Sequence, residues 1–227
     1  MRTVSIKDRS QGRWIWVIPI FLLAAMVAIV FLAPAEKTLG ETIRYVYVHV
    51  AFTRSGMFGF YAAGVFGLLL AVTAWPSLGS WTRILLWVSY LFFLLGGIAS
   101  VFAQQQSWGG MMLAEPRNRT TLSVLAVGII ILILSGWMPW LRLRGLSYMA
   151  LAAYVAWTLP RTPLILHPAN AAGSSPSAVI RLVFPLLTLL AGLLGLWLVW
   201  YLGRRGVKSS ALAHPADPRT ATAAAPR

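Results

Sequence analysis

The feature that most constrains this chain is a series of long apolar runs. Five runs are long enough to cross the hydrocarbon core of a bilayer, which is about 30 Å thick and takes about 20 helical residues. They cover residues 14–33, 50–75, 84–103, 122–141 and 179–202. A weaker run, 146–159, reaches that length only if it extends toward Leu166. The sequence therefore predicts an all-α integral membrane protein with six transmembrane helices.

The composition excludes a soluble globular domain. Hydrophobic residues make up 59% of the 227 residues and charged residues only 11%, whereas soluble domains have about 25% charged residues. The first apolar run is longer than the core of a signal peptide, and no cleavage site follows Phe31, so we expect it to remain in the mature protein. The absence of cysteine excludes disulfides, a thiolate metal site and a cysteine nucleophile.

The distribution of Lys and Arg predicts the orientation, because these residues accumulate in short cytoplasmic segments. With the N-terminus inside and six spans, most of the basic residues fall on the inner side. The outer side keeps Lys37, Arg44, Arg54, Arg117, Arg119, Arg161 and Arg181. We therefore expect both termini in the cytoplasm. Topology and anionic lipid account for the net charge of +14, and no basic domain is left to bind nucleic acid.

The chain is expected to have three parts. Residues 1–13 form a cytoplasmic N-terminal segment, and residues 14–202 form the six-helix transmembrane domain. Residues 203–227 are rich in Ala, Pro, Arg and Ser without an apolar period, which predicts a disordered cytoplasmic tail. His214 lies in this tail, and we interpret it as a solvated residue without a function.

Three connections, 34–48, 104–120 and 160–178, are expected on the outer face. His49 directly follows the first of them and His167 lies in the third, so both imidazoles are expected at one edge of the bundle. Histidine is the commonest protein ligand of haem iron, and an ionisable residue at a membrane suggests a function. The alternative is that each histidine bonds a loop carbonyl, and the sequence leaves that alternative open.

The middle outer connection has the composition of a platform for a flat ligand. It contains Trp108 beside two methionines, Met111 and Met112, and then the two arginines Arg117 and Arg119. Guanidinium groups bind carboxylates in a bidentate manner, so the arginines would complement the propionates of a haem. An equally valid interpretation is that the arginines contact lipid phosphate and that the tryptophan anchors the bundle in the membrane.

Two segments resemble a known family. The sequence Tyr47-Val48-His49-Val50 resembles the Tyr-x-His-Val element of the haem-handling membrane proteins of cytochrome c assembly, the CcmC, CcmF and CcsA group. The six spans and the order of the loops are most similar to the CcmC family of haem exporter proteins. In the tryptophan-rich loop of that family, matches are found at Trp108, Gly109 and Arg117, with Glu115 in place of aspartate.

The chain also departs from the family pattern. Three further tryptophans of the loop are replaced by Met111, Met112 and Ala114. A proline and a tryptophan that follow the first histidine are replaced by Ala51 and Arg54. The resemblance therefore implies a weaker stacking platform than in typical members, and Trp108 alone is assigned to it.

The resemblance implies haem delivery without catalysis. Haem b would be a transient cargo on the outer face of the bacterial cytoplasmic membrane, with His49 and His167 as the two axial ligands. The partners implied are a membrane-anchored haem chaperone of the CcmE type, ABC transporter subunits of the CcmA and CcmB type, and a small CcmD-type subunit. Haem lyases of the same superfamily carry a second histidine pair, and only His214 remains here, which favours delivery.

Two functions without a cofactor remain as alternatives, namely a permease and a structural subunit of an ABC-type complex. A permease is expected to carry ionisable residues deep inside its spans or broken helices. The spans instead contain Gly96, Gly97, Gly192 and Gly195, which we expect to allow close helix packing. A structural subunit that binds no haem is not excluded by the sequence.

Overall fold

A computed structural model describes residues 15–165 and 175–213. Within these ranges the chain forms six helices and no strand, apart from an isolated bridge between Glu36 and Gly40. The helices are α2 (Val17–Leu32), α3 (Ile43–Thr73), α4 (Pro76–Trp108), α5 (Pro116–Trp137), α6 (Leu141–Arg161) and α7 (Ala178–Ala213). The predicted all-α class is confirmed for the described part of the chain.

Four of these helices are long and apolar enough to cross a membrane. They are α3, α4, α5 and the Ala178–Arg205 portion of α7. Helix α2 is apolar but has only 16 residues. Helix α6 has 21 residues but includes Arg142, Arg144 and Arg161, which lower its hydropathy. The chain is thus a helical membrane protein, whereas its six spans and their orientation stay predictions.

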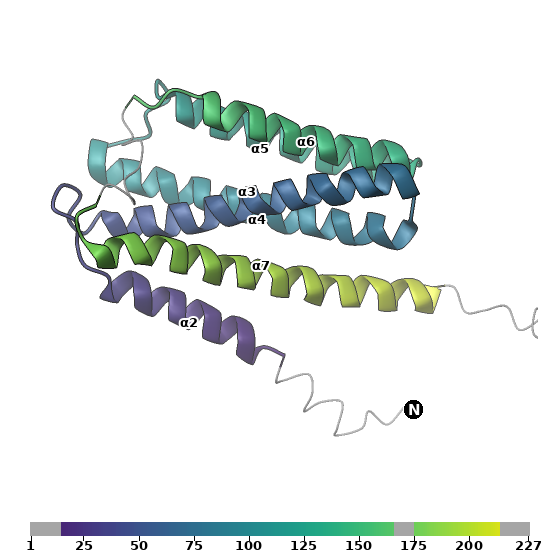
Figure 1. Cartoon of the computed structure of the whole chain (residues 1–227), viewed down its shortest axis with the longest axis horizontal. Coiled ribbons are helices and arrows are strands. Elements are labelled where there is room, and N and C mark those ends of the chain that lie inside the picture. The colour runs from purple at the N-terminus through teal and green to yellow at the C-terminus, as the bar shows by residue number, and fades with distance from the viewer. Residues whose placement is uncertain (1–14, 166–174, 214–227) are drawn as a thin grey trace, which may run out of the picture.

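The helices lie side by side and alternate in direction (Figure 1). The connections 33–42 and 109–115 lie at one end of the bundle, together with the end of α6 and the start of α7, and we call this end the loop end. The short connections 74–75 and 138–140 lie at the opposite end. The loop end corresponds to the predicted outer edge of the bundle.

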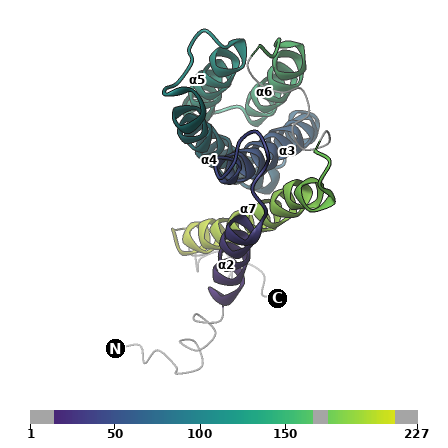
Figure 2. The ribbon, with the colours of Figure 1, turned by 90° about the vertical axis from the view of Figure 1, so that its left-hand side faces the viewer.

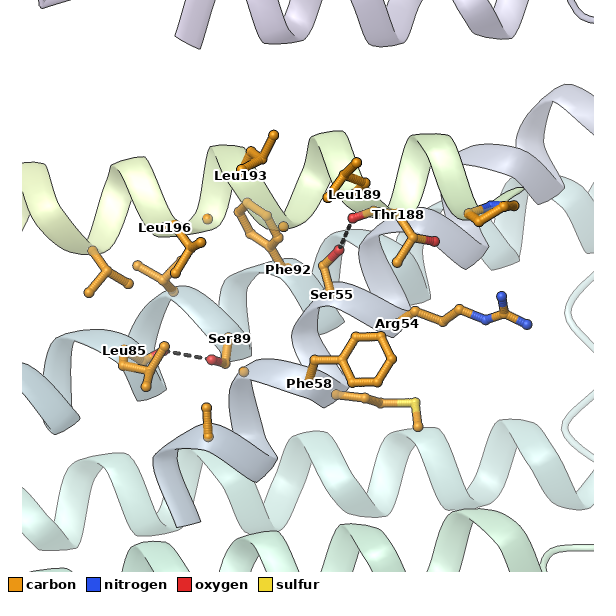
Figure 3. A pocket seen from close by; sticks show the side chains of 18 residues that line it. Arg54, Ser55, Phe58, Leu85, Ser89, Phe92, Thr188, Leu189, Leu193 and Leu196 are labelled. Carbon is orange, nitrogen blue, oxygen red and sulfur yellow. Dashed lines mark hydrogen bonds between the residues drawn. The ribbon is translucent and has the colours of Figure 1, made fainter. Parts of the chain in front are cut away.

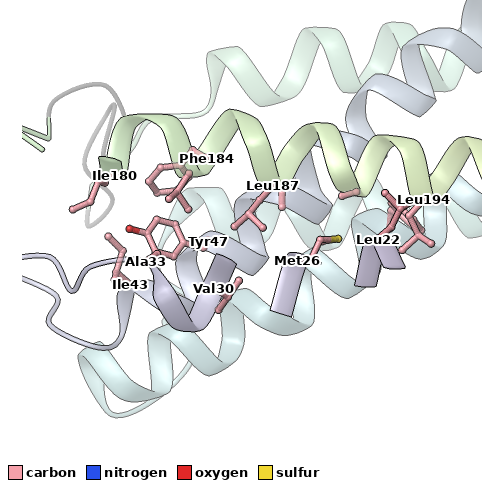
Figure 4. Packing of buried hydrophobic residues seen from close by; sticks show 14 of the residues in the cluster. Leu22, Met26, Val30, Ala33, Ile43, Tyr47, Ile180, Phe184, Leu187 and Leu194 are labelled. Atoms are coloured by element: carbon pink, nitrogen blue, oxygen red, sulfur yellow. The ribbon is translucent and has the colours of Figure 1, made fainter. Parts of the chain in front are cut away.

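Seen along the bundle, the helices form successive layers (Figure 2). Helices α5 and α6 form one layer, α3 and α4 form the next, and α7 and then α2 follow. Helix α3 is central, because it packs against α4, α6, α7 and α2. One apolar cluster includes Phe60, Phe93 and Tyr148, and a second joins α2, α3 and α7, where Tyr47 contacts Phe184 edge-on (Figure 4).

Glycines bring α3 and α4 into close contact. A Cβ atom on Gly96 would come within 2.6 Å of the backbone nitrogen of Thr53, and a Cβ on Gly56 within 2.6 Å of the backbone nitrogen of Phe93. Small residues have this role in lipid, where close van der Waals packing holds helices together. The packing role expected for Gly96 is confirmed. The same expectation is wrong for Gly192, whose added Cβ would meet no atom within 4 Å.

The helices extend beyond the apolar runs, so several predicted boundaries are wrong. The predicted outer connection 34–48 is shortened, because α3 begins at Ile43. The connection 104–120 is reduced to 109–115, because α4 and α5 continue into its polar ends. With 31 residues, α3 is about 46 Å long and exceeds the hydrocarbon core. Hydropathy marks only the part of a helix that lies in lipid.

The predicted tail is also shorter than expected. Helix α7 continues past Leu202 to Ala213, so the prediction of disorder is wrong for residues 203–213. The remainder of the tail, with His214, lies outside the described residues, as do residues 1–14.

Candidate functional site

His49 lies in the second turn of α3 and faces α4. Its Nδ1 atom is 2.8 Å from the carbonyl oxygen of Gly96. A carbonyl only accepts hydrogen bonds, so Nδ1 must carry the hydrogen and donate it. In the neutral ring the lone pair is then on Nε2. Metal-bound histidines commonly have this arrangement, in which one ring nitrogen donates to a carbonyl and the other coordinates the metal.

The neighbouring residue Thr53 lies one helical turn further along α3. Its Oγ1 atom is 3.3 Å from His49 Nδ1, and Thr53 supplies the atoms nearest to a Cβ placed on Gly96, with Oγ1 first and the backbone nitrogen next. The absence of a side chain on Gly96 therefore brings its carbonyl within reach of the imidazole. The orientation of the ring depends on the close contact between the two helices.

A cavity of about 320 Å³ opens beside His49 in the half of the bundle near the loop end. We call it the His49 cavity. Its lining comes from α3, α4, α5, α6 and the adjoining connections, and its polar lining residues include His49, Thr53, Ser100, Gln104, Arg117, Asn118 and Thr121. Met111 also lines it. Its volume is at the lower end of the range for small-molecule sites, about 300–1,000 Å³.

Arg117 brings a positive charge to the same cavity. Its side chain is half-buried, and Nη1 donates a hydrogen bond to the carbonyl oxygen of Leu159 at the end of α6. Within the described residues this is the one hydrogen bond of the guanidinium group. A guanidinium has five N–H donors, so it is able to hold Leu159 and an anionic ligand group together. The predicted propionate role is compatible with this position.

Two buried amide side chains hold the ends of α4 and α5 together. Gln104 Nε2 is 3.1 Å from Asn118 Oδ1, and Asn118 Nδ2 is 2.6 Å from Gln104 Oε1. Asn118 also donates to the Met112 carbonyl, and the Met112 backbone N–H donates to Gln104. The pair thus fixes the connection 109–115 over the His49 cavity. The sequence analysis missed this pair, although both residues are polar and flank the Trp-Gly connection.

Glu115, which served above only for the family comparison, is a buried carboxylate at the start of α5. Its side chain is 1% exposed, and Oε1 accepts a hydrogen bond of 3.3 Å from the backbone N–H of Ile165. It precedes Pro116, the first residue of α5, where a negative charge is favoured by the helix dipole. Glu115 therefore joins the start of α5 to the segment that follows α6.

The structure does not bring all the predicted site residues together. Arg119 is exposed, donates through Nε to the Leu113 carbonyl at 2.8 Å, and lines a separate hollow between α5 and α6. Trp108 is the last residue of α4 and does not line the His49 cavity. Neither residue therefore lines the cavity that His49, Met111 and Arg117 share, and their role as haem contacts stays a prediction.

His167, the second predicted axial ligand, lies outside the described residues. In the described part of the chain, no three His, Cys, Asp or Glu side chains gather around one point. A haem does not need such a group, because the protein supplies one axial ligand on each face of the ring. The tautomer of His49 fits that requirement for one face.

The fold and the site together define a helical membrane protein with a histidine and an arginine in a cavity near the loop end. A scan against models of known protein families gives no match, and neither does a comparison with curated proteins. The family resemblance thus rests on the motif residues given above.

Proposed function

We propose that this chain is a haem-handling membrane protein of cytochrome c biogenesis. In this proposal it holds haem b at the outer face of the bacterial cytoplasmic membrane and passes it to a membrane-anchored haem chaperone of the CcmE type. It would act beside ABC transporter subunits of the CcmA and CcmB type and a small CcmD-type subunit. It performs no covalent chemistry and is not an enzyme.

The observation that supports the proposal most strongly is the hydrogen bond between His49 and Gly96. It leaves the neutral ring with its lone pair on Nε2, which is the form that binds iron. A histidine with only a structural role would also bond a carbonyl, but it has no need of a cavity. His49 lines a cavity with Arg117, and that arginine suits a propionate.

Each residue has a distinct part in this proposal. Haem supplies an iron centre that takes two axial ligands and two propionates that need cations. His49 is one axial ligand, and His167 is assigned the other from the sequence. Arg117 orients a propionate while it holds Leu159, and Met111 offers a pliable apolar surface. Trp108 and Arg119 lie outside the cavity and are assigned no direct contact.

The proposed topology has six spans with both termini in the cytoplasm. An aromatic cluster at the end opposite the loop end supports a membrane boundary there. Trp197 and Tyr201 stack with ring centroids 5.0 Å apart, Trp16 contacts both, and Arg205 lies over Tyr201. Aromatic residues with adjacent arginines are typical of the membrane interface, and arginine is enriched on the cytoplasmic side.

Complementation tests delivery directly. A bacterial strain without its own CcmC-type protein makes no mature c-type cytochrome, and haem staining of its periplasmic cytochromes measures recovery. We expect the parent chain and the His214→Ala control to restore staining, and the His49→Ala variant to fail. Equal staining with the His49→Ala variant would contradict delivery through this histidine. No staining with any chain that reaches the membrane would favour a structural subunit that binds no haem.

A further inference from the structure

A cavity larger than the His49 cavity lies on another side of the bundle, away from His49. It is a groove of about 740 Å³ between α3, α4 and α7. Apolar side chains such as Phe58, Leu189, Leu193 and Leu196 form its walls, and these four are exposed (Figure 3). Along α7 the groove extends from Pro185 to Val199, which is about 21 Å of helix. In a bilayer its open side faces lipid.

Arg54 is the one charged residue in the lining of this groove. Among the lining residues of α3 it lies nearest the loop end, as Pro185 does on α7. Its side chain is exposed and extends away from the Leu196 end (Figure 3). Arg54 makes no hydrogen bond or ion pair with another described residue, whereas Arg44, Arg117, Arg119 and Arg181 each do.

The depth of Arg54 suits the boundary between headgroups and acyl chains. It lies eleven positions after Ile43, or about 16 Å along α3. Because α3 is about 46 Å long and the hydrocarbon core about 30 Å thick, centred placement puts the Arg54 backbone about 8 Å inside the core. An arginine side chain is long enough to reach from there toward the headgroups. A positive charge at this depth, with no negative side chain bonded to it among the described residues, would be stabilised by a bound anion.

The dimensions of the groove favour an alkyl chain over a helix of a partner protein. A helix of a partner protein has a diameter of about 10–12 Å with its side chains, so a 21 Å length of it would fit into a groove of about 740 Å³ only in part. A narrow alkyl chain fits a long apolar groove of this volume. A cation at the outer mouth adds the requirement for a negatively charged headgroup.

We propose that this groove is a binding site for an anionic phospholipid of the outer leaflet, with one acyl chain along α7 and the headgroup phosphate on Arg54. The site is independent of the haem site. Its ligand is a structural lipid that fills the space between α3, α4 and α7, where Ser55 donates a hydrogen bond of 3.1 Å to the Thr188 carbonyl. The site would strengthen the contact of α7 with the central helices.

Two substitutions separate the headgroup from the acyl chain. The Arg54→Gln variant removes the charge and breaks no hydrogen bond or ion pair with another described residue, and Arg54→Lys keeps the charge. The Gly192→Leu variant fills the groove, because a Cβ at this position meets no atom within 4 Å. Arg161→Gln is the matched control, since Arg161 is exposed at the end of α6 and lines a different hollow.

The experiment uses the full chain in nanodiscs of phosphatidylcholine with a minority of phosphatidylglycerol, followed by native mass spectrometry of the released protein. We expect the parent, Arg54→Lys and Arg161→Gln to keep one phosphatidylglycerol. With Arg54→Gln we expect the preference over phosphatidylcholine to fall about tenfold, because a hydrogen bond to a charged group contributes about that factor. Gly192→Leu should lose both lipids.

Three results would overturn the proposal. The first is an equal preference for phosphatidylglycerol in the parent and in Arg54→Gln. The second is retention of the lipid by Gly192→Leu, which would place it elsewhere on the protein. The third is a parent that is released from the nanodiscs without any bound lipid.

Discussion

His49 and Gly96 are joined across the contact between α3 and α4 by a hydrogen bond of 2.8 Å from Nδ1 to the backbone carbonyl. Neither residue alone would fix the tautomer and the orientation of the imidazole. The imidazole requires an acceptor that sets its tautomer, and the carbonyl comes close only because Gly96 has no side chain. The contact therefore couples the packing of two helices to the chemistry of a candidate ligand.

This coupling is tested by the variant Gly96→Ala. The added Cβ would come within 2.6 Å of the Thr53 backbone nitrogen, so α3 and α4 must separate. We expect the free energy of unfolding to fall by about 1–3 kcal/mol, as in other overpacked sites, and haem binding to be lost with it. Thermal unfolding in detergent and a haem titration measure the two effects.

The neighbouring glycine is a matched control for that variant. A Cβ on Gly97 would meet only Thr121 and Leu125, at 3.8 and 3.9 Å, which are ordinary contact distances. We expect Gly97→Ala to unfold like the parent and to bind the same amount of haem. A similar loss in both variants would mean that the position of His49 does not depend on the close approach of Gly96.

The buried amide pair leads to a second expectation. In Asn118→Leu, Gln104 loses its two hydrogen bonds to Asn118 but keeps those to Ser100 and to the Met112 N–H, and the Met112 carbonyl loses its side-chain donor. An unsatisfied buried polar group costs about 1–3 kcal/mol. We expect the free energy of unfolding to fall by that amount. In the double variant Gln104→Leu, Asn118→Leu, part of the loss should be recovered, because the Gln104 amide is removed together with its partner, although the Met112 backbone N–H and carbonyl lose their side-chain partners. Chemical unfolding of both variants checks this, and a double variant less stable than the single one would contradict it.

The two arginines of the first turn of α5 should differ in their effect on haem. Arg117 lines the His49 cavity and bonds the Leu159 carbonyl, whereas Arg119 bonds the Leu113 carbonyl at the surface. We expect Arg117→Ala to weaken haem binding about tenfold, the factor typical of one charge-assisted hydrogen bond. Arg119→Ala should leave the dissociation constant within about twofold of the parent, as is usual for surface substitutions. An equal loss of haem affinity in the two variants would indicate that both guanidinium groups contact the haem.

The orientation is tested with reporter fusions. A periplasmic reporter fused after Met112, in the connection between α4 and α5, should be active, because the distribution of Lys and Arg puts the loop end outside. A fusion after Arg144, in the first turn of α6, should be inactive. The reverse pattern would place His49 on the cytoplasmic side.

The helices were largely predictable, because long apolar runs are marked by hydropathy alone. Their ends were not, since the outer turns of α3, α4 and α5 contain polar residues that a hydropathy window excludes. Gln104 shows the difference, because its position in a predicted loop hides that it is buried in α4. A helix that extends past the lipid keeps its hydrogen bonds in water as well.

The candidate site was predictable only in part. His49 stood out because histidine is rare in an apolar chain, and Arg117 because it follows the tryptophan connection. The sequence did not indicate that Arg119, two positions away, faces a different hollow. Residues two positions apart on a helix point to different sides of it, so neighbouring charges need not share a site. The bond to the Gly96 carbonyl depends on the packing of α4 against α3, which periodicity does not define.

The most direct test of the central claim is haem binding by the purified protein. Absorption spectra and pyridine haemochrome assays would compare the parent, His49→Ala, His167→Ala and the control His214→Ala, all purified in detergent from cells supplied with haem. We expect b-type haem in the parent and the control, and loss of occupancy with a changed spectrum in the other two variants. Equal haem in His49→Ala and the parent, or no haem in any of them, would contradict the assignment of His49 as a haem ligand.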